Sequence, residues 1–474
     1  MKGQPRQPTN GSMPNDKSTT TASRAETATS LGHEFRLQRR IAVPLIAGFM
    51  AEIGMWFTDA VIVGHLGSTE LGAVSLAGLI FWEIVLTGAA MLSVVGVFVG
   101  NAYGRGETAA VQRTVQQGLW LACALSLPVM VLSWHLMTLL SFTGQDAVVL
   151  SLGTDYLHTL IWTVLPLFLF TVQHNFLTGL ARPRVVTVIV VLALPVNAAL
   201  NYVLVFGALG LPAMGVAGAG LGTSIVNWLM LLALVAYIVR NPAFSTYNIF
   251  RNLGVLDFSE WRQICRIGLP AAGIRAIGGS VFIVLTVLMG LFGAAALAAN
   301  HIVITVIVFS TVITVGLGET AAVRVAQEMG AGRPQAASRA GKLTISVGFA
   351  SAACCAVILW LATGTIAAVF LDTSNPANGP VVVLIEPIAR IAAVYIMFEA
   401  VKLITDRALR GRQDTFVPMC IGAIGAWGMA IPLGALLAFA FDQGPVGLWW
   451  GLAFGYATSA VLLWVRWRRL GAMP

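Results

Sequence analysis

The sequence predicts an all-α integral membrane protein with twelve transmembrane helices in two six-helix repeats. Three observations lead to this prediction: the composition, the number and length of the apolar runs, and a match of the chain with itself. Hydrophobic residues make up 57% of the 474 residues, and charged residues only 10%. A soluble core cannot hold so large an apolar share, so we expect the chain to lie in a lipid bilayer.

Twelve apolar runs follow one another along the chain. Each is long enough to cross a hydrocarbon core of roughly 30 Å at about 1.5 Å per residue. Each must be helical, because a lipid-exposed backbone needs all its hydrogen bonds satisfied within the segment. The predicted spans are 41–65, 71–99, 113–140, 149–178, 185–209, 215–239, 264–292, 296–323, 340–370, 382–408, 415–440 and 444–465.

The second half of the chain repeats the first. A shift of 226 positions places Val63 to Leu71 over Met289 to Leu297, and Gly104-Arg105-Gly106 over Gly330-Ala331-Gly332. Duplicated halves that rock about a central site are common among transporters. The predicted divisions are a disordered cytoplasmic tail over 1–35, an amino lobe over 36–240, a cytoplasmic linker over 241–263 and a carboxy lobe over 264–474.

The segments between the helices predict little chemistry. The tail is rich in Ser, Thr, Asn, Pro and Gly and has no apolar run, so it is not a signal peptide. The loops at Gly104 and Gly330 lack the Lys-Ser that follows a phosphate-binding loop. The five cysteines have no metal-site spacing. We therefore expect no cofactor and no structural metal, and an H⁺ or Na⁺ gradient as the energy source.

The basic residues predict the orientation. If both termini are cytoplasmic, nearly all Lys and Arg of the short loops fall on the cytoplasmic side, as the positive-inside bias requires. The net charge of +8 then reports topology in a cytoplasmic (inner) membrane rather than a nucleic-acid partner. The residues on this side are Arg105, Arg113, Arg182, Arg184, Arg240, Arg251, Arg262, Arg266, Arg324, Arg333, Arg339, Lys342, Arg410, Arg412, Arg466, Arg468 and Arg469.

Polar side chains within the apolar runs are the candidate functional residues, because a charge at mid-membrane costs about 2.5 kcal/mol or more. Asp59 lies in the outer half of the first run, where a short carboxylate needs a proton, a cation or nearby donors. Asn197 and Asn201 share a face of the fifth helix just after Pro195. Their amide oxygens suit Na⁺, although Asn also serves as interhelical hydrogen-bond glue.

The second half carries a different charge pattern. Glu399, Lys402 and Asp406 align on one face of the tenth helix, which favours either a cavity cluster or a structural ion-pair ladder. We also expect Arg275 to neutralise Glu319. Four further polar residues lie in the apolar runs with weaker claims to function: Glu52, Glu83, His174 and Asn175.

Six motifs in order resemble the multidrug and toxic compound extrusion (MATE) transporters over nearly the full chain. They are Phe57 to Gly64, Leu71 to Ala77, Pro195 to Asn201, Gly268-Leu269-Pro270, Arg324-Val325 with Gly330-Ala331-Gly332, and Ala408 to Thr415. The resemblance implies a MATE-type fold whose two lobes are related by a pseudo-twofold axis along the membrane normal. It also implies export of cationic or amphipathic compounds in exchange for H⁺ or Na⁺.

The resemblance also assigns roles to residues. Asp59 matches the ion-coupling aspartate, and Pro44 matches the proline at which the first helix bends. Asn197, Asn201 and Thr223 match the other polar members of the amino-lobe site, where a transient Na⁺ is possible at Asp59, Asn197 and Asn201. Glu399 matches an acid of the carboxy-lobe cation site.

The carboxy lobe departs from the family pattern. Gly278 stands where many Na⁺-coupled relatives have a glutamate, and Arg275 and Lys402 add positive charge. Such a site should repel Na⁺, which leaves Asp59 as the coupling centre. We hypothesise that Glu319 replaces the missing acid.

Two rival functions stay open. A flippase for lipid-linked precursors would want a more basic cavity and often extra helices. A membrane-embedded enzyme would need a compact constellation, whereas the histidines are dispersed. We expect a monomer whose partners are the bilayer and small-molecule cationic or amphipathic substrates, with no nucleic acid. The six histidines are His33, His65, His135, His158, His174 and His301.

Overall fold

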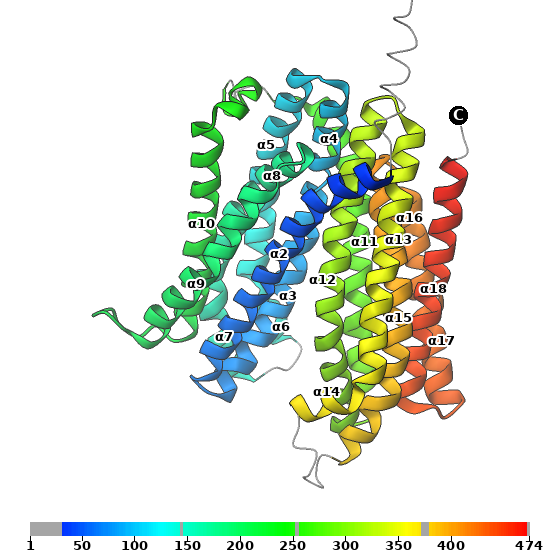
Figure 1. Ribbon diagram of the computed structural model, residues 1–474. Helices are drawn as coiled ribbons and strands as arrows, with labels where there is room; N and C mark the ends of the chain where they lie inside the picture. The colour runs from blue at the N-terminus through cyan, green and yellow to red at the C-terminus, as the bar shows by residue number, and fades with distance from the viewer. Residues whose placement is uncertain (1–30, 143–145, 252–255, 371–378, 472–474) are drawn as a thin grey trace, which may run out of the picture.

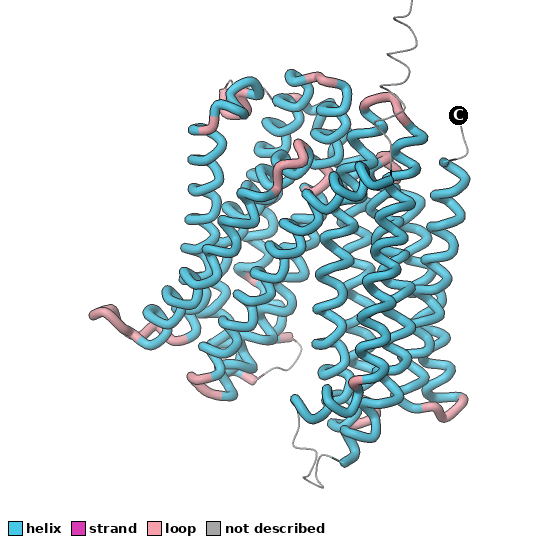
Figure 2. The backbone as a smooth tube through the Cα atoms, in the orientation of Figure 1, coloured by secondary structure: helices cyan, strands magenta, loops and turns pink. Residues whose placement is uncertain are grey.

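The computed structural model describes residues 31–142, 146–251, 256–370 and 379–471, and all regular structure in these ranges is helical (Figure 2). The amino-terminal half contains α2 (Leu31–Gly64), α3 (Ser68–Leu92), α4 (Val95–Arg105), α5 (Thr108–Trp134), α6 (Leu136–Ser141), α7 (Ala147–Leu160), η1 (Ile161–Thr163), α8 (Val164–Gly179), α9 (Arg184–Phe206), α10 (Val216–Arg240) and η2 (Pro242–Tyr247). The carboxy-terminal half contains α11 (Phe258–Gly290), α12 (Ala294–Gly330), α13 (Pro334–Leu361), α14 (Thr363–Phe370), α15 (Gly379–Gly411), α16 (Phe416–Ala423), η4 (Ile424–Ala430), α17 (Ile431–Ala435), η5 (Leu436–Ala440) and α18 (Gly444–Gly471).

The predicted twelve membrane-spanning helices are confirmed within the described residues. Several spans combine shorter elements: α3 with α4 forms the second, and α7, η1 and α8 form the fourth. The ends differ from the sequence-based spans. The first helix begins at Leu31 instead of 41 and thus includes the last residues of the predicted tail, whereas residues 1–30 lie outside the described ranges.

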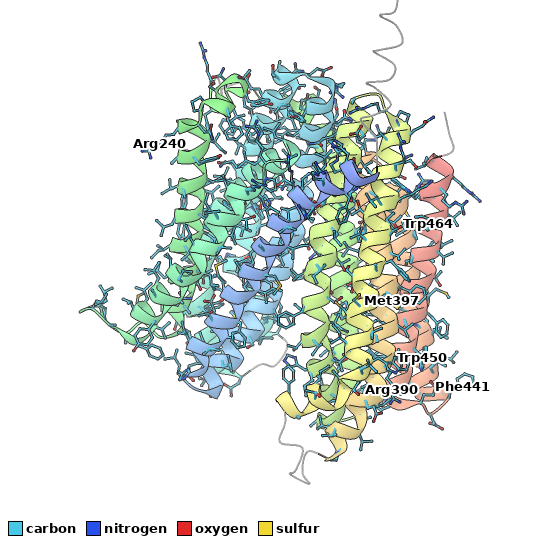
Figure 3. The ribbon with its side chains drawn as sticks, in the orientation of Figure 1. Arg240, Arg390, Met397, Phe441, Trp450 and Trp464 are labelled. Atoms are coloured by element: carbon cyan, nitrogen blue, oxygen red, sulfur yellow. The ribbon has the colours of Figure 1, made fainter. Side chains whose placement is uncertain are left out.

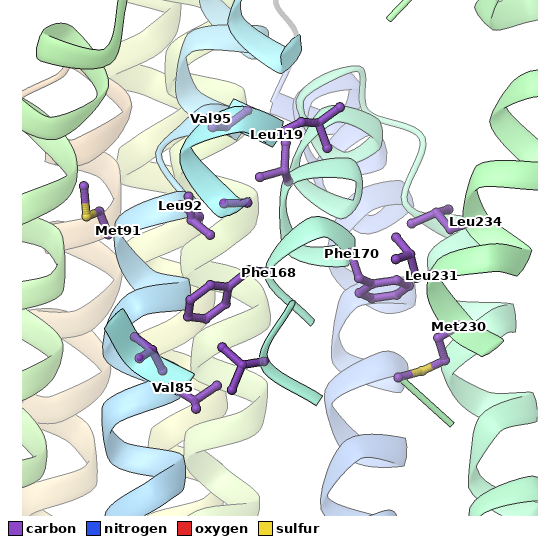
Figure 4. Close-up of a cluster of buried hydrophobic side chains, with 14 of the residues drawn as sticks. Val85, Met91, Leu92, Val95, Leu119, Phe168, Phe170, Met230, Leu231 and Leu234 are labelled. Carbon is purple, nitrogen blue, oxygen red and sulfur yellow. The ribbon is translucent and has the colours of Figure 1, made fainter. Parts of the chain in front are cut away.

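Two helical bundles lie side by side (Figure 1). We call the bundle of α2–α10 the amino lobe and that of α11–α18 the carboxy lobe. Large apolar side chains from α3, α4, α5, α8 and α10 fill the amino-lobe core, with Phe168 fully buried among them (Figure 4). Tyr395 and Trp449 occupy the corresponding place between α15 and α18.

The described chain begins and ends at the same end of the bundle, which we call the termini end (Figure 1). Figure 3 places Arg240 and Trp464 toward this end and Arg390, Phe441 and Trp450 toward the other. Arg390 forms an ion pair with Glu386 one helical turn away, which compensates its charge. Aromatic side chains at both levels are what two membrane interfaces favour.

The first helix of each lobe packs on the opposite lobe at its start. Ala42, before Pro44 of α2, belongs to a core cluster of the carboxy lobe, whereas Ala51 belongs to the amino-lobe core. In the same way Ile267, before Pro270 of α11, packs into the amino-lobe core. Pro44 and Pro270 are related by the 226-residue repeat, so the packing of each first helix on the opposite lobe is a feature of both repeats.

The repeats meet face to face at the termini end. A Cβ on Gly104 would lie 2.1 Å from the carbonyl oxygen of Gln327, and one on Gly330 would lie 2.0 Å from that of Asn101. Each pair is the repeat image of the other, as at a self-complementary twofold contact. These glycines therefore do more than end helices: their missing side chains let α4 and α12 touch across the pseudo-twofold axis.

A buried ionic cluster joins the lobes at the same end. The Arg324 guanidinium of α12 donates from Nε (3.0 Å) and Nη2 (2.7 Å) to the two carboxylate oxygens of Glu34 on α2. Arg324 also donates to Glu328 (2.7 Å) and Gln327 (2.9 Å), and Gln327 donates to the Gly179 carbonyl of α8 (2.8 Å). We call this set the termini-end latch. The lobes are thus closed together here, whereas Figure 1 shows them diverging toward the opposite end.

Candidate functional site

The amino-lobe site is built around Asp59 of α2. Its Oδ1 accepts a hydrogen bond from Asn201 Nδ2 of α9 at 2.5 Å, and its Oδ2 accepts from Thr223 Oγ1 of α10 at 3.4 Å. Helix α2 and two helices that lie much later in the sequence, α9 and α10, thus converge on one carboxylate. Thr223 also donates to the Ala219 carbonyl at 3.0 Å, so its hydroxyl is shared between two acceptors.

Two buried amide oxygens on the same face of α9 lack a donor. Asn197 is 1% exposed and Asn201 0%, and the Oδ1 atom of each is buried with no hydrogen-bond partner. Buried polar atoms are nearly always paired, so two orphaned acceptors on one helix face call for a donor or a cation. Gly222 permits the arrangement, because a Cβ there would lie only 1.9 Å from Asn201 Oδ1.

Tyr156 of α7 also lies near Asp59, although the sequence did not predict it as a site residue. It is 7% exposed and close enough to Asp59 to interact with its charge. Asn227, one turn after Thr223, holds the backbone of α10 by donating to the Thr223 carbonyl at 2.9 Å. Neither residue stood out in the sequence, because tyrosine and asparagine at these positions look like ordinary packing or hydrogen-bond glue.

The arrangement suits a small monovalent cation or a proton. Carboxylate, amide and hydroxyl oxygens are hard ligands, and a proton on Asp59 would equally neutralise the buried charge. Among the residues that the structure describes, no group of three or more His, Cys, Asp or Glu is placed to hold a metal ion.

In the carboxy lobe, Glu399 of α15 accepts from Thr311 Oγ1 of α12 at 3.2 Å. Tyr395 and Tyr456 lie next to it, with ring centroids 4.9 Å apart. A Cβ on Gly278 would meet no atom within 4 Å, so there is open space at the position where the family resemblance led us to look for a second acid. Glu399 is thus left as a single acid with hydroxyl neighbours.

The predicted ladder of Glu399, Lys402 and Asp406 is not formed at ion-pair distance. The Lys402 ammonium lies over the Tyr456 ring, 4.7 Å from its centroid, and no carboxylate within the described ranges lies within 4 Å of it. A cation–π contact takes the place of the salt bridges. One helix face aligns the three residues, but Glu399 contacts Thr311 on α12 and Lys402 contacts Tyr456 on α18.

The expected pairing of Arg275 with Glu319 is wrong. Arg275 of α11 instead donates to Glu83 of α3, with Nη1 3.0 Å from Oε1 and Nη2 2.9 Å from Oε2. This bidentate pair joins the two lobes near mid-membrane, where both side chains remain partly exposed. Arg275 is therefore compensated by the amino lobe and adds less positive charge to the Glu399 region than the sequence suggests.

Glu319 belongs to a separate buried cluster. It accepts from Arg410 Nη2 at 2.7 and 2.9 Å and is also paired with Arg407. Arg410 further donates to Ser93 of the amino lobe at 2.7 Å. A carboxylate saturated by two guanidinium groups is a poor cation ligand, which argues against Glu319 as a replacement for the missing acid.

Comparison with known proteins gives one consistent family. The profile of the MatE family matches residues 44–203 and 270–436. The probable multidrug resistance protein NorM of Mesorhizobium japonicum is 35% identical, over 92% of this chain and 94% of that protein. The probable multidrug resistance protein NorM of Pseudomonas aeruginosa is 34% identical, over 93% of this chain and 91% of that protein.

Solved structures agree in fold. The crystal structure of the eukaryotic MATE transporter AtDTX14 matches with a TM-score of 0.82 at 21% identity, covering 92% of this chain and 97% of that one. A multidrug resistance MATE family transporter of the MOP superfamily, solved in an outward-facing conformation, matches with a TM-score of 0.83 at 16% identity, covering 92% and 96%. The predicted twelve-helix, two-lobe fold class is confirmed.

Proposed function

Because the chain belongs to the MATE family of membrane transporters, we propose that it is a secondary antiporter that expels cationic or amphipathic compounds in exchange for H⁺ or Na⁺. The observation that carries this proposal is the Asp59 site, where a membrane-embedded carboxylate accepts hydrogen bonds from Asn201 and Thr223 and where the buried amide oxygens of Asn197 and Asn201 on α9 lack a donor. Such a site is incomplete without a proton or small cation, which is what an ion-coupled exporter must bind and release.

The mechanism follows from where the lobes touch. The termini-end latch closes one end of the interface, and the described helices of the two lobes diverge toward the opposite end, so the Asp59 site would receive its ion from that side. Ion binding would weaken the hold of the Asp59 carboxylate on Asn201 and Thr223 and change how α2 packs on α9 and α10. Because α2 also carries Pro44 and the latch residue Glu34, this change would reach the interface between the lobes.

Substrate recognition would use charge and aromatic faces. The rings of Trp56 on α2 and Trp82 on α3 lie 5.7 Å apart; Trp56 lies shortly before Asp59 in the sequence, and Trp82 directly precedes Glu83. Trp56 is 49% exposed. A lipophilic cation gains from aromatic faces through cation–π contacts and from nearby carboxylates through charge.

In this proposal both termini lie in the cytoplasm and the protein resides in the inner membrane. The concentration of Lys and Arg at the termini end supports that orientation. The protein would work as a monomer, because every member of the Asp59 site comes from the same chain.

The test is dye efflux from proteoliposomes under imposed Na⁺ or H⁺ gradients. The unmodified chain should export an aromatic cation under at least one of the two gradients. Under that gradient Asp59→Asn should lose export, and Glu399→Gln should retain more of it. Export at the normal rate by Asp59→Asn, together with its loss in Glu399→Gln, would move the coupling centre to the carboxy lobe. No gradient-driven export by the unmodified chain would overturn the proposed function itself.

A further inference from the structure

A small, partly open cavity of the amino lobe is lined by two half-buried ionisable side chains that the proposed mechanism does not use. It lies between α2, α8 and α9 and is lined by Glu52, His174, Thr187 and apolar neighbours. Its volume of about 10 Å³ is close to the room that one water molecule needs.

Within the described ranges, neither Glu52 nor His174 has a hydrogen-bond or ion-pair partner. The Thr187 hydroxyl is already engaged, because it donates to the Pro44 carbonyl at 2.7 Å. An unpaired carboxylate in a membrane helix is costly, and so is an unpaired imidazolium. One proton shared by the two groups removes both costs. If Glu52 holds the proton, both side chains are neutral, and if His174 holds it, the imidazolium and the carboxylate compensate each other's charge.

The cavity fits a proton and a water better than an alkali cation. Na⁺ needs several oxygen ligands, and this cavity offers one carboxylate and one hydroxyl whose proton points elsewhere. An imidazole nitrogen is a poor ligand for a hard cation but a good proton acceptor. The cavity is also far too small for a drug-sized ligand, which needs roughly 300 Å³ or more.

We propose that Glu52 and His174 form a second proton-binding site of the amino lobe, in which one proton passes between the Glu52 carboxylate and a His174 ring nitrogen through a single water molecule. Each transfer breaks one N–H or O–H bond and forms another, so no further reactant is required. The site is distinct from Asp59, although its use in coupling rests on the proposed function.

The position of the site gives it a role between the coupling carboxylate and the other lobe. Glu52 lies seven residues before Asp59 on the same face of α2, about 10 Å nearer the termini end. On the other side His174 lies within electrostatic range of Glu319 on α12, which is held by Arg407 and Arg410 of α15. No ionisable residue of α9 lines the cavity. A proton at this site therefore changes the charge that the inter-lobe cluster at Arg410 and Ser93 experiences.

Infrared difference spectroscopy during a pH titration of the purified protein in lipid nanodiscs tests this site without any transport step. The C=O stretch of protonated carboxylic acids should show one component that Asp59→Asn removes and another that Glu52→Gln removes. His174→Gln, or His174→Asn if the first variant is unstable, should move the midpoint of the Glu52 component by about one pH unit, as expected of coupled groups. Matched controls are Glu386→Gln and His301→Gln, whose side chains are exposed.

The proposal fails if Glu52→Gln leaves every carboxylic-acid component in place. It also fails if the histidine variants leave the midpoint of the Glu52 component unchanged. Failure of the proposed function looks different: both components would be present in a protein that exports nothing under a gradient.

Discussion

Glu34→Gln should open the termini end of the transporter. The carboxylate of Glu34 receives two hydrogen bonds from the guanidinium of Arg324, at 2.7 and 3.0 Å, and these side chains are only 17% and 9% exposed. The amide of glutamine keeps one acceptor oxygen but loses the charge and one of the two bonds. Arg324 keeps Glu328 as a counter-ion, so the carboxy lobe itself should stay folded.

The expected loss is about 1.5 to 3 kcal/mol, the usual contribution of a hydrogen bond to a charged group. This free energy is gained only when the lobes are closed at the termini end, so its loss multiplies the open population by about 10 to 150. An open fraction of about 1% would then rise to between about 9% and 60%.

Pulsed electron–electron distance measurement reads this population directly. Spin labels at Ala109 and Gln335 would report on the two lobes, because both positions are exposed and begin equivalent helices, α5 and α13. The five native cysteines are replaced first. Unmodified protein should give one short distance, and Glu34→Gln should add a longer one.

Two controls decide what the result means. Glu328→Gln removes a carboxylate from the same arginine but within one lobe, so it should shift the distances less. Glu386→Gln, in an exposed pair at the other end, should shift nothing. An unchanged distance distribution in Glu34→Gln, or an equal shift in Glu328→Gln, would refute the account of the latch.

Three other predictions follow from the geometry. Gly330→Ala should weaken the closed contact between the lobes by about 1 to 3 kcal/mol, because its Cβ would meet the Asn101 backbone. Gly422→Ala is the control, since a Cβ there has open space around it. The same pair of spin labels measures both variants, and equal distances would count against the glycine contact. Asn201→Ala should reduce gradient-driven efflux more than Asn175→Ala, because only Asn201 donates to Asp59; equal rates would remove Asn201 from the site. Hydrogen bonds from Ser259 lower the pKa of Asp257, so the start of α11 should lose this stabilisation as pH falls through that pKa. The protection of amides near Ser259 against hydrogen exchange, relative to their intrinsic rate at each pH, measures the loss, and protection that does not change with pH would contradict it.

Much of the fold was predictable because the bilayer allows few solutions. A lipid-exposed backbone must be helical, so apolar length alone located the twelve spans. The start of α2 escaped prediction because its residues are polar: Glu34 is buried by Arg324 of the other lobe, and no pattern within its own helix reveals that partner. An apolar run therefore shows which part of a helix lies in lipid, but it does not show how far the helix continues through polar residues that are buried against another helix.

The candidate site was only partly predictable for a similar reason. Asp59 and Asn201 stood out because polar groups in membranes are costly, and the structure brings them together. Arg275 and Glu319 stood out equally but found other partners, Glu83 and Arg410. Sequence spacing fixes which face of its own helix a charge occupies, whereas the identity of the neighbouring helix depends on tertiary packing.

Substrate-induced proton release tests the coupling at Asp59 most directly. A lipophilic aromatic cation would be added to the purified transporter in a weakly buffered, Na⁺-free solution while the pH is recorded. If the substrate binds better when the Asp59 carboxylate is deprotonated, the unmodified protein should release protons in proportion to the substrate that it binds. Asp59→Asn should still bind the cation but should release markedly fewer protons. Equal release by Asp59→Asn and the unmodified protein would contradict the assignment of Asp59 as the coupling residue.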